Sequence, residues 1–183
     1  MGKVIAVAGQ IASGKTTTLA EFMETHGFER IVTYTTRPKR NGEKDGVSYH
    51  FLTADEFLEK AEAGFFAEDM GFTAKFGYVR YGTSKESLET PDSMNKVIVL
   101  NPEGVKNLKE SGYDIFTVYL DVPQEVLMRR ALQRGDDPAE IGRRIADDTR
   151  KFRDMESRGF VDLHITNPLL LPNQITEMIR AAL

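Results

Sequence analysis

Short apolar runs alternate with segments of helical periodicity along most of this chain. The runs Lys3–Ala8, Lys96–Leu100 and Ile115–Val122 are apolar along most of their length, which is typical of strands buried on both faces of a sheet. Between them, apolar residues recur every three or four positions, and this spacing predicts amphipathic helices. The same criteria predict strands at Arg30–Thr35 and His164–Thr166, helices at Lys15–His26, Pro102–Ser111, Pro123–Arg134 and Pro138–Arg158, and a last helix that buries Ile175, Met178, Ile179 and Ala182.

The section 35–95 departs from this alternation. It is polar, aromatic and rich in turns, and its one clear helix begins after a capping box of Thr53 and Glu56 and ends at Gly64. We therefore predict an insertion of mixed α+β structure. Its small core is expected to contain Phe51, Phe57, Phe65, Phe66, Phe72 and Phe76.

The remainder of the chain predicts an α/β core. Strands that alternate with crossover helices form a parallel sheet covered by helices on both faces. The core is therefore expected at 1–34 and 96–183, within a single domain of 183 residues.

The stretch Gly9–Thr16 matches G-x-x-x-x-G-K-[ST] and lies between a predicted strand and a predicted helix, as a phosphate-binding loop does. Glycine at Gly9 and Gly14 lets phosphate approach the backbone N–H groups, and the helix start adds its positive dipole end. Lys15 adds a mobile positive charge, and the hydroxyl of Thr16 suits Mg²⁺, which prefers oxygen ligands. A nucleoside triphosphate such as ATP is therefore expected at Gly9, Gln10, Ile11, Ala12, Ser13, Gly14, Lys15, Thr16 and Thr17.

A second group of donors follows in the insertion. Arg37 and Arg40 lie three positions apart around Pro38, with Thr33 before them and Tyr49 after them. Two guanidinium groups with a phenol and hydroxyls suit a phosphate monoester. Taken alone, these residues favour a solvated basic loop or a nucleic-acid-binding patch over a phosphate site.

Composition narrows the choice. The net charge of −4 argues against general nucleic-acid binding, and the lack of cysteine excludes disulfides and thiolate metal sites. The start of the chain has too short an apolar run for a signal peptide or membrane span, so we expect a cytoplasmic protein without membrane contact.

The motif order resembles that of the guanylate kinase family. After the phosphate-binding loop come "TTRPKRNGEKDGVSYHF", "FFAEDMG", "YVRYGTSKESLE", "LMRRALQRG" and "HITNP", and together they cover nearly the whole chain. The resemblance implies a five-stranded parallel core, a nucleoside-monophosphate-binding insertion and a short lid at about 135–145. It also implies transfer of the γ-phosphoryl group of ATP to GMP or dGMP, with Mg²⁺.

The resemblance also implies site residues. Arg37, Arg40, Tyr49 and Tyr81 should hold the acceptor phosphate, and Glu68, Thr33 and Thr83 should meet the guanine edge. Guanine presents N1–H and an N2 amino group as adjacent donors, and the carboxylate of Glu68 offers only acceptors. The catalytic set implied is Lys15, Arg37, Arg130, Arg134 and Arg144, with Asn167 near the adenine, whereas Arg143, Arg150 and Arg153 are expected to pair with surface carboxylates.

Three departures from the family pattern stand out. The family's D-x-D segment is replaced by "VLN", so that Val99 and Asn101 stand where aspartates are expected. Asn101, a candidate contact of the acceptor base, keeps an acceptor oxygen but loses the charge. The segment between Glu68 and Tyr81 is about four residues longer than the family norm, and the lid contains Pro138.

Two other interpretations are compatible with the sequence. A related kinase could use a different (deoxy)nucleoside monophosphate or a phosphorylated small molecule as acceptor. A guanylate kinase-like module could instead bind peptides without catalysis, although the phosphate-binding loop is intact here. We expect small-molecule nucleotides as partners, and a monomer or a homodimer.

Overall fold

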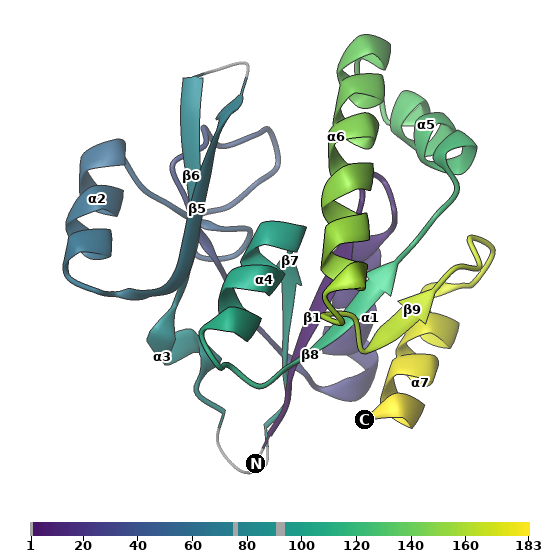
Figure 1. Cartoon of the computed structure of the whole chain (residues 1–183), viewed down its shortest axis with the longest axis horizontal. Helices are drawn as coiled ribbons and strands as arrows, with labels where there is room; N and C mark the ends of the chain where they lie inside the picture. Colours follow the sequence, from purple (N-terminus) through teal and green to yellow (C-terminus); the bar gives the residue numbers. More distant parts are fainter. Residues whose placement is uncertain (1, 75–76, 91–93) are drawn as a thin grey trace.

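The computed structural model describes residues 2–74, 77–90 and 94–183, which form two sheets with their flanking helices (Figure 1). The core sheet has five strands, all parallel, in the order β2-β7-β1-β8-β9. The predicted five-stranded parallel core is therefore confirmed. Its strands are β1 (Val4–Gly9), β2 (Glu29–Arg30), β7 (Lys96–Leu100), β8 (Ile115–Leu120) and β9 (Leu163–Ile165).

Helices cover both faces of this sheet because alternate side chains of β1 enter two separate clusters. Ala6 packs with the cluster that α4 (Pro102–Glu110) and α6 (Pro138–Ser157) complete. Val7 packs with the cluster that α1 (Lys15–His26) and α7 (Pro172–Ala182) complete. A third cluster joins α5 (Gln124–Gln133) to the N-terminal half of α6. This arrangement leaves the carboxyl ends of the strands free for the loops that bind ligands.

The second sheet forms a lobe beside the core (Figure 1). Its strand order is β4-β3-β6-β5. The predicted capping box of Thr53 and Glu56 is present at the start of α2, and Gly64 has the left-handed φ of 68° expected after a helix. The elements of the lobe are β3 (Tyr34–Thr35), β4 (His50–Phe51), α2 (Ala54–Glu62), β5 (Phe66–Ala74), β6 (Gly77–Ser84) and α3 (Lys85–Leu88).

The single strand predicted at Arg30–Thr35 is wrong. Arg30 ends β2 in the core sheet, and Tyr34 begins β3 in the second sheet. Periodicity within one strand carries no information about its partner, so the sequence did not show that the chain crosses between sheets here. The structure therefore places the passage between core and lobe just after Arg30.

Three burial predictions are also wrong. On α7, Ile179 is fully buried, whereas Met178 is 43% exposed and Ala182 is exposed as well, because the helix packs on α1 through a narrower stripe than its apolar residues suggest. In the insertion, Phe57 and Phe66 stack at 4.5 Å and are buried, but Phe72 is 40% exposed. Phe76 lies outside the described residues.

Among the residues that the structure describes, no helix has both the length and the apolar character needed to cross a membrane.

Candidate active site

The phosphate-binding loop connects β1 to α1 through a tight turn. Gly14 caps the helix with a φ of 105°, and Ala12 also adopts a positive φ of 58°. A Cβ on Gly9 would lie 2.4 Å from Ser13 Oγ and 3.0 Å from the carbonyl oxygen of Leu120. Gly9 and Gly14 are therefore required by close approach and by backbone conformation, respectively.

The ammonium group of Lys15 folds back over this loop. Its Nζ donates to the carbonyl oxygens of Gly9 and Gln10, at 2.7 Å in each case. Burial lowers the pKa of Lys15 to about 8, and the nearby charges of Asp148 and Arg144 act on it in opposite directions. Negative charge on an incoming phosphate would restore full protonation, because an anion favours the ammonium form.

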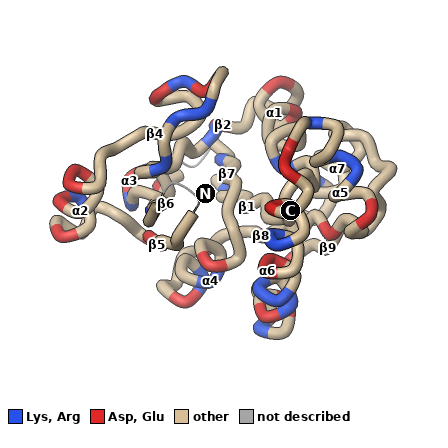
Figure 2. Tube along the Cα trace, turned by 90° about the horizontal axis from the view of Figure 1, so that it is seen from above, with Lys and Arg blue, Asp and Glu red and all other residues tan. Residues whose placement is uncertain are grey.

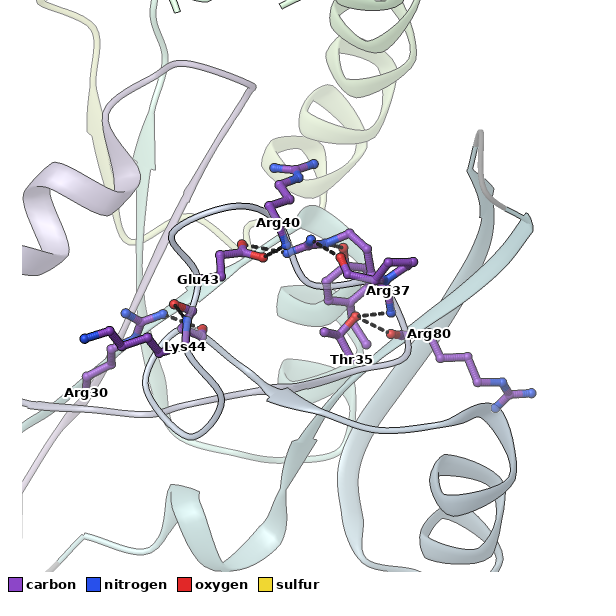
Figure 3. A network of polar contacts seen from close by, with 10 residues as sticks. Arg30, Thr35, Arg37, Arg40, Glu43, Lys44 and Arg80 are labelled. Carbon is purple, nitrogen blue, oxygen red and sulfur yellow. Dashed lines mark hydrogen bonds and ion pairs between the residues drawn. The ribbon is translucent and has the colours of Figure 1, made fainter.

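A second set of contacts surrounds the guanidinium of Arg37, which is only 5% exposed (Figure 3). Its Nε donates to the hydroxyl of Tyr81 at 3.1 Å, and its Nη2 pairs with Glu43 Oε1 at 2.8 Å. Burial opposes the charge of Arg37, but its bonds to Glu43 and Tyr81 raise its pKa above the ordinary value. Arg37 is thus an oriented cation that already holds an internal anion.

Tyr49 completes this clamp, which we define as Arg37, Tyr49 and Tyr81. The guanidinium carbon of Arg37 lies 5.4 Å from the centre of the Tyr49 ring, and the rings of Tyr49 and Tyr81 meet edge to face at 5.9 Å. Thr33 lies in the connection between β2 and β3, where its carbonyl accepts from the backbone N–H of His50. The structure therefore brings together three of the four predicted phosphate ligands.

The fourth, Arg40, faces the core. Its side chain is exposed and points away from the carboxylate of Glu43, toward α6 (Figure 3). The pKa of Asp136 is lowered first by its bond to Arg134 and also by the charges of Arg40 and Arg144. Arg40 from the lobe and two arginines from the core therefore share the electrostatic field of one carboxylate. Arg40 of the lobe therefore lies within electrostatic reach of the loop before α6.

Glu68 is a buried acid of the lobe. It pairs with Thr83 across β5 and β6, and the Thr83 hydroxyl donates to Glu68 Oε1 at 2.6 Å. Glu68 is 7% exposed, and its Oε2 is buried without a partner. Burial raises the pKa of Glu68 to about 7. The second oxygen of Glu68 thus receives no hydrogen bond from the residues that the structure describes.

Asn101 lies close to this carboxylate. A Cβ on Gly104, near the start of α4, would be 3.5 Å from both Glu68 Oε2 and Asn101 Oδ1. Asn101 Oδ1 caps α4 by accepting from the Gly104 N–H at 2.8 Å, and its Nδ2 contacts Met70 Sδ. Asn101 therefore has a structural role as a helix cap, for which asparagine serves as well as aspartate.

The remaining predicted nucleotide ligands divide into two groups. Arg134 pairs with Asp136, and Arg144 acts electrostatically on Lys15. Arg130 instead donates to the carbonyl of Pro168 at 2.8 Å, in the loop where Asn167 Oδ1 caps a turn. Arg134 and Arg144 thus lie near the phosphate-binding loop, whereas Arg130 braces the loop after β9.

Charges along α6 interleave in sign (Figure 2). Arg143 pairs with Glu140 at 3.1 Å, and Arg150 lies 3.8 Å from Asp147. For these two arginines the expected pairing with surface carboxylates is confirmed.

Sequence reasoning missed two carboxylates. Glu43 pairs with Arg37, and its position in the turn after Arg40 was the available signal. Asp148 is half-buried near Lys15, and burial raises its pKa. Its spacing of four from Arg144 would have placed both on one helix face.

The comparison with known proteins decides the family. The family model described as guanylate kinase matches residues 1–170. The chain belongs to the guanylate kinase family. It is 36% identical over 171 residues to the guanylate kinase of Nitratidesulfovibrio vulgaris, which covers 91% of this chain and 79% of that protein. It is 30% identical over 172 residues to that of Sus scrofa, which covers 91% of this chain and 85% of that protein.

The fold agrees with this assignment. The crystal structure of guanylate kinase from Anaplasma phagocytophilum is similar with a TM-score of 0.71 at 22% identity, over 98% of this chain and 86% of that chain. The segment after Glu68 forms the β5–β6 hairpin, whose pairing continues beyond Met70–Tyr81 to Ala74–Gly77. Glu68 pairs with Thr83 in the same hairpin.

Few of the described side chains are suited to act as ligands of Mg²⁺. Thr16 is exposed in the first turn of α1, whereas Val99 packs against the core cluster and Asn101 caps α4. In the ranges 2–74, 77–90 and 94–183, no group of three or more His, Cys, Asp or Glu side chains is arranged to hold a metal. The chain fits a Mg²⁺ ion bound mainly by triphosphate and water oxygens, which this ion tolerates well, with one protein hydroxyl.

The packing at Gly9 yields a first prediction. Gly9→Ala adds a methyl group against Ser13 and Leu120, and overpacking of this kind costs about 1–3 kcal/mol. We expect the affinity for ATP, measured by calorimetry, to fall on the order of tenfold. Adding Ser13→Ala removes the shorter contact and should recover part of the loss. Unchanged affinity in Gly9→Ala would contradict the tight loop.

Glu68 yields a second prediction. Its pKa is about 7 in the folded chain against an ordinary 4.5, so the folded state gives up its proton less readily than the unfolded chain. The resulting loss of stability is small below about pH 4.5, grows as the pH rises and is complete above about pH 7. Glu68→Gln should therefore raise the free energy of unfolding at about pH 8 by ~2–3 kcal/mol more than at about pH 4.5.

Urea denaturation at the two pH values measures this difference. Glu59→Gln, on the exposed side of α2, is the matched control and should show the same effect at both. If Glu68→Gln changed the free energy of unfolding equally at both pH values, burial would not raise the pKa of this carboxyl.

Proposed function

We propose that this guanylate kinase transfers the γ-phosphoryl group of ATP to GMP or dGMP, giving ADP and GDP or dGDP. The observation that carries the proposal is the buried carboxylate of Glu68, with one oxygen unpaired, in the lobe that also holds the Arg37 clamp. The carboxylate would bind the guanine base of GMP, and the clamp would bind its phosphate.

The donor half is the loop between β1 and α1. Its backbone N–H groups and the ammonium of Lys15 would hold the phosphates of ATP, and Lys15 would exchange its two carbonyl partners for phosphate oxygens. Mg²⁺ bound to ATP, with Thr16 as its protein ligand, supplies further positive charge at the phosphates.

The acceptor half is the lobe. The phosphate of GMP would replace Glu43 as the partner of Arg37, with Tyr49 and Tyr81 as further donors. The unpaired oxygen of Glu68 would accept from guanine N1–H or N2–H. At the same edge adenine presents the N1 acceptor and a C2–H group, so AMP bound in the same orientation would leave this buried oxygen unsatisfied.

Transfer then requires positioning and charge neutralisation more than covalent chemistry. A phosphate oxygen of GMP forms a bond to the γ-phosphorus while the bond from that phosphorus to the β,γ-bridging oxygen breaks. Arg134 and Arg144 lie where they would stabilise the charge of the transferred group, once Arg134 exchanges Asp136 for phosphate. Closing about 135–145 as a lid would exclude water.

The two alternative functions would give different results in an activity assay. A kinase for another acceptor would prefer a different monophosphate, and a peptide-binding module would consume no ATP. The intact loop and the buried Glu68 favour the guanylate kinase activity. With nucleotides as its partners, we expect a cytoplasmic protein without nucleic-acid or membrane contact, monomeric or homodimeric.

The test is ATP consumption across the common ribo- and deoxyribonucleoside monophosphates. We expect GMP and dGMP to be the best acceptors and AMP to be poor. Glu68→Gln should lower the ratio of kcat/KM for GMP over AMP on the order of 10- to 100-fold, since a buried polar mismatch of this type costs about 1–3 kcal/mol.

Two controls accompany this assay. Glu59→Gln should leave the ratio unchanged, and Lys15→Ala should remove turnover with every acceptor. Turnover with AMP equal to that with GMP in the wild-type chain would overturn the assigned acceptor, and no turnover with any acceptor would overturn the kinase activity itself.

A further inference from the structure

Arg30 links the core sheet to the lobe at the point where the chain passes between them. It is the last residue of β2, and its Nη2 donates to the carbonyl oxygen of Ser48 at 2.8 Å (Figure 3). Its Nε is buried and has no partner. Burial lowers the pKa of Arg30, and the neighbouring Tyr49 opposes this change. The guanidinium of Arg30 is half-buried and joins the core sheet to the lobe, so it is not a solvated surface charge.

The loop that Arg30 holds is closed by its own hydrogen bonds. The N–H of Ser48 donates to the carbonyl of Lys44 at 2.8 Å, and the Lys44 N–H donates to Ser48 Oγ at 3.1 Å. The N–H of Gly46, which has a φ of 71°, donates to the carbonyl of Tyr49 at 2.9 Å. Residues 44–49 therefore form one compact turn, which is tied to β4 by the bond from the Phe51 N–H to Asp45 Oδ1 and to β2 by the bond from Arg30.

Tyr49 ends this turn and belongs to the clamp. Its ring lies over the guanidinium of Arg37 on one side, and Ser48, the residue before it, accepts from Arg30 on the other. Burial raises the pKa of Tyr49, while the charges of Arg37 and Arg30 lower it, so both cations lie within electrostatic reach of the phenol.

We propose that Arg30 is a positioning residue for the acceptor phosphate: by gripping the Ser48 carbonyl from the end of β2, it fixes the turn 44–49 and so places Tyr49 against Arg37. This inference rests on the proposed function, because it assumes that the clamp binds a monophosphate. Arg30 acts through Tyr49 and contacts the loop, not the reacting atoms. Since the bond crosses from core to lobe, it also couples the placement of the clamp to the core sheet.

The experiment compares Arg30→Met, which removes the guanidinium and its bond to Ser48, with Arg30→Lys, which keeps a positively charged donor. We expect Arg30→Met to raise the KM for GMP on the order of tenfold, as the loss of one charged hydrogen bond does, while kcat and the KM for ATP stay within about twofold. Arg30→Lys should recover part of the change. Lys44→Met removes an exposed cation from the same turn and is the control for charge alone.

Equilibrium binding of GMP without ATP separates this inference from the proposed function. A wild-type chain that binds GMP but transfers nothing would overturn the function and leave the dissociation constants of the variants to decide on Arg30. Equal dissociation constants for wild type and Arg30→Met would overturn the role of Arg30 in an active enzyme. An effect of Lys44→Met as large as that of Arg30→Met, or an equal rise in the KM for ATP, would also overturn it.

Amide hydrogen exchange provides a readout that does not depend on any nucleotide. Without the Arg30 bond, the backbone N–H groups of residues 44–49 should exchange faster, while those of the β5–β6 hairpin should not change. Unchanged exchange in the turn would show that Arg30 does not hold it. If Arg30→Met fails to fold, Arg30→Lys gives the same comparison at reduced amplitude.

Discussion

A carboxylate kept out of water with one oxygen unpaired is the constraint around which the lobe is built. Glu68 satisfies one oxygen through Thr83, which the register of β5 and β6 places directly opposite. The start of α4 lies on the other side, where a Cβ on Gly104 would be 3.5 Å from the second oxygen, in ordinary van der Waals contact. Such a group destabilises the fold unless a ligand completes it, so its position indicates where binding free energy is gained.

The cations of the site are held by internal partners in the same way. Lys15 contacts two carbonyls, Arg37 contacts Glu43, and Arg134 contacts Asp136. Each partner can be exchanged for a phosphate oxygen without leaving a bare charge. The site is thus oriented before the substrates arrive, and phosphate binding replaces one set of hydrogen bonds with another.

The features that sequence predicted are those encoded locally. The loop Gly9–Thr16 is a contiguous signal, the core strands are read from short apolar runs, and the start of α2 is fixed by Thr53 and its neighbours. The features that it missed depend on partners distant in the chain. Neither the split after Arg30 nor the pairing of Glu43 with Arg37 follows from periodicity, because both depend on how the lobe folds against itself and the core.

Asn101 illustrates both what the sequence predicts and what it misses. The sequence marks it as a departure from the family pattern that keeps an acceptor oxygen but loses the charge of an aspartate. The structure adds that its side chain caps α4 beside Glu68, a role that depends on the fold of β7 and α4.

The most direct test of the account is the proton balance of GMP binding, measured by calorimetry at about pH 7 in buffers of different ionisation enthalpy. Glu68 is close to half protonated there in the free chain, and pairing with guanine donors requires its ionised form. The wild-type chain should therefore release roughly half a proton more than Glu68→Gln does. Equal proton release by the two chains would contradict the claim that this buried carboxyl reads the base.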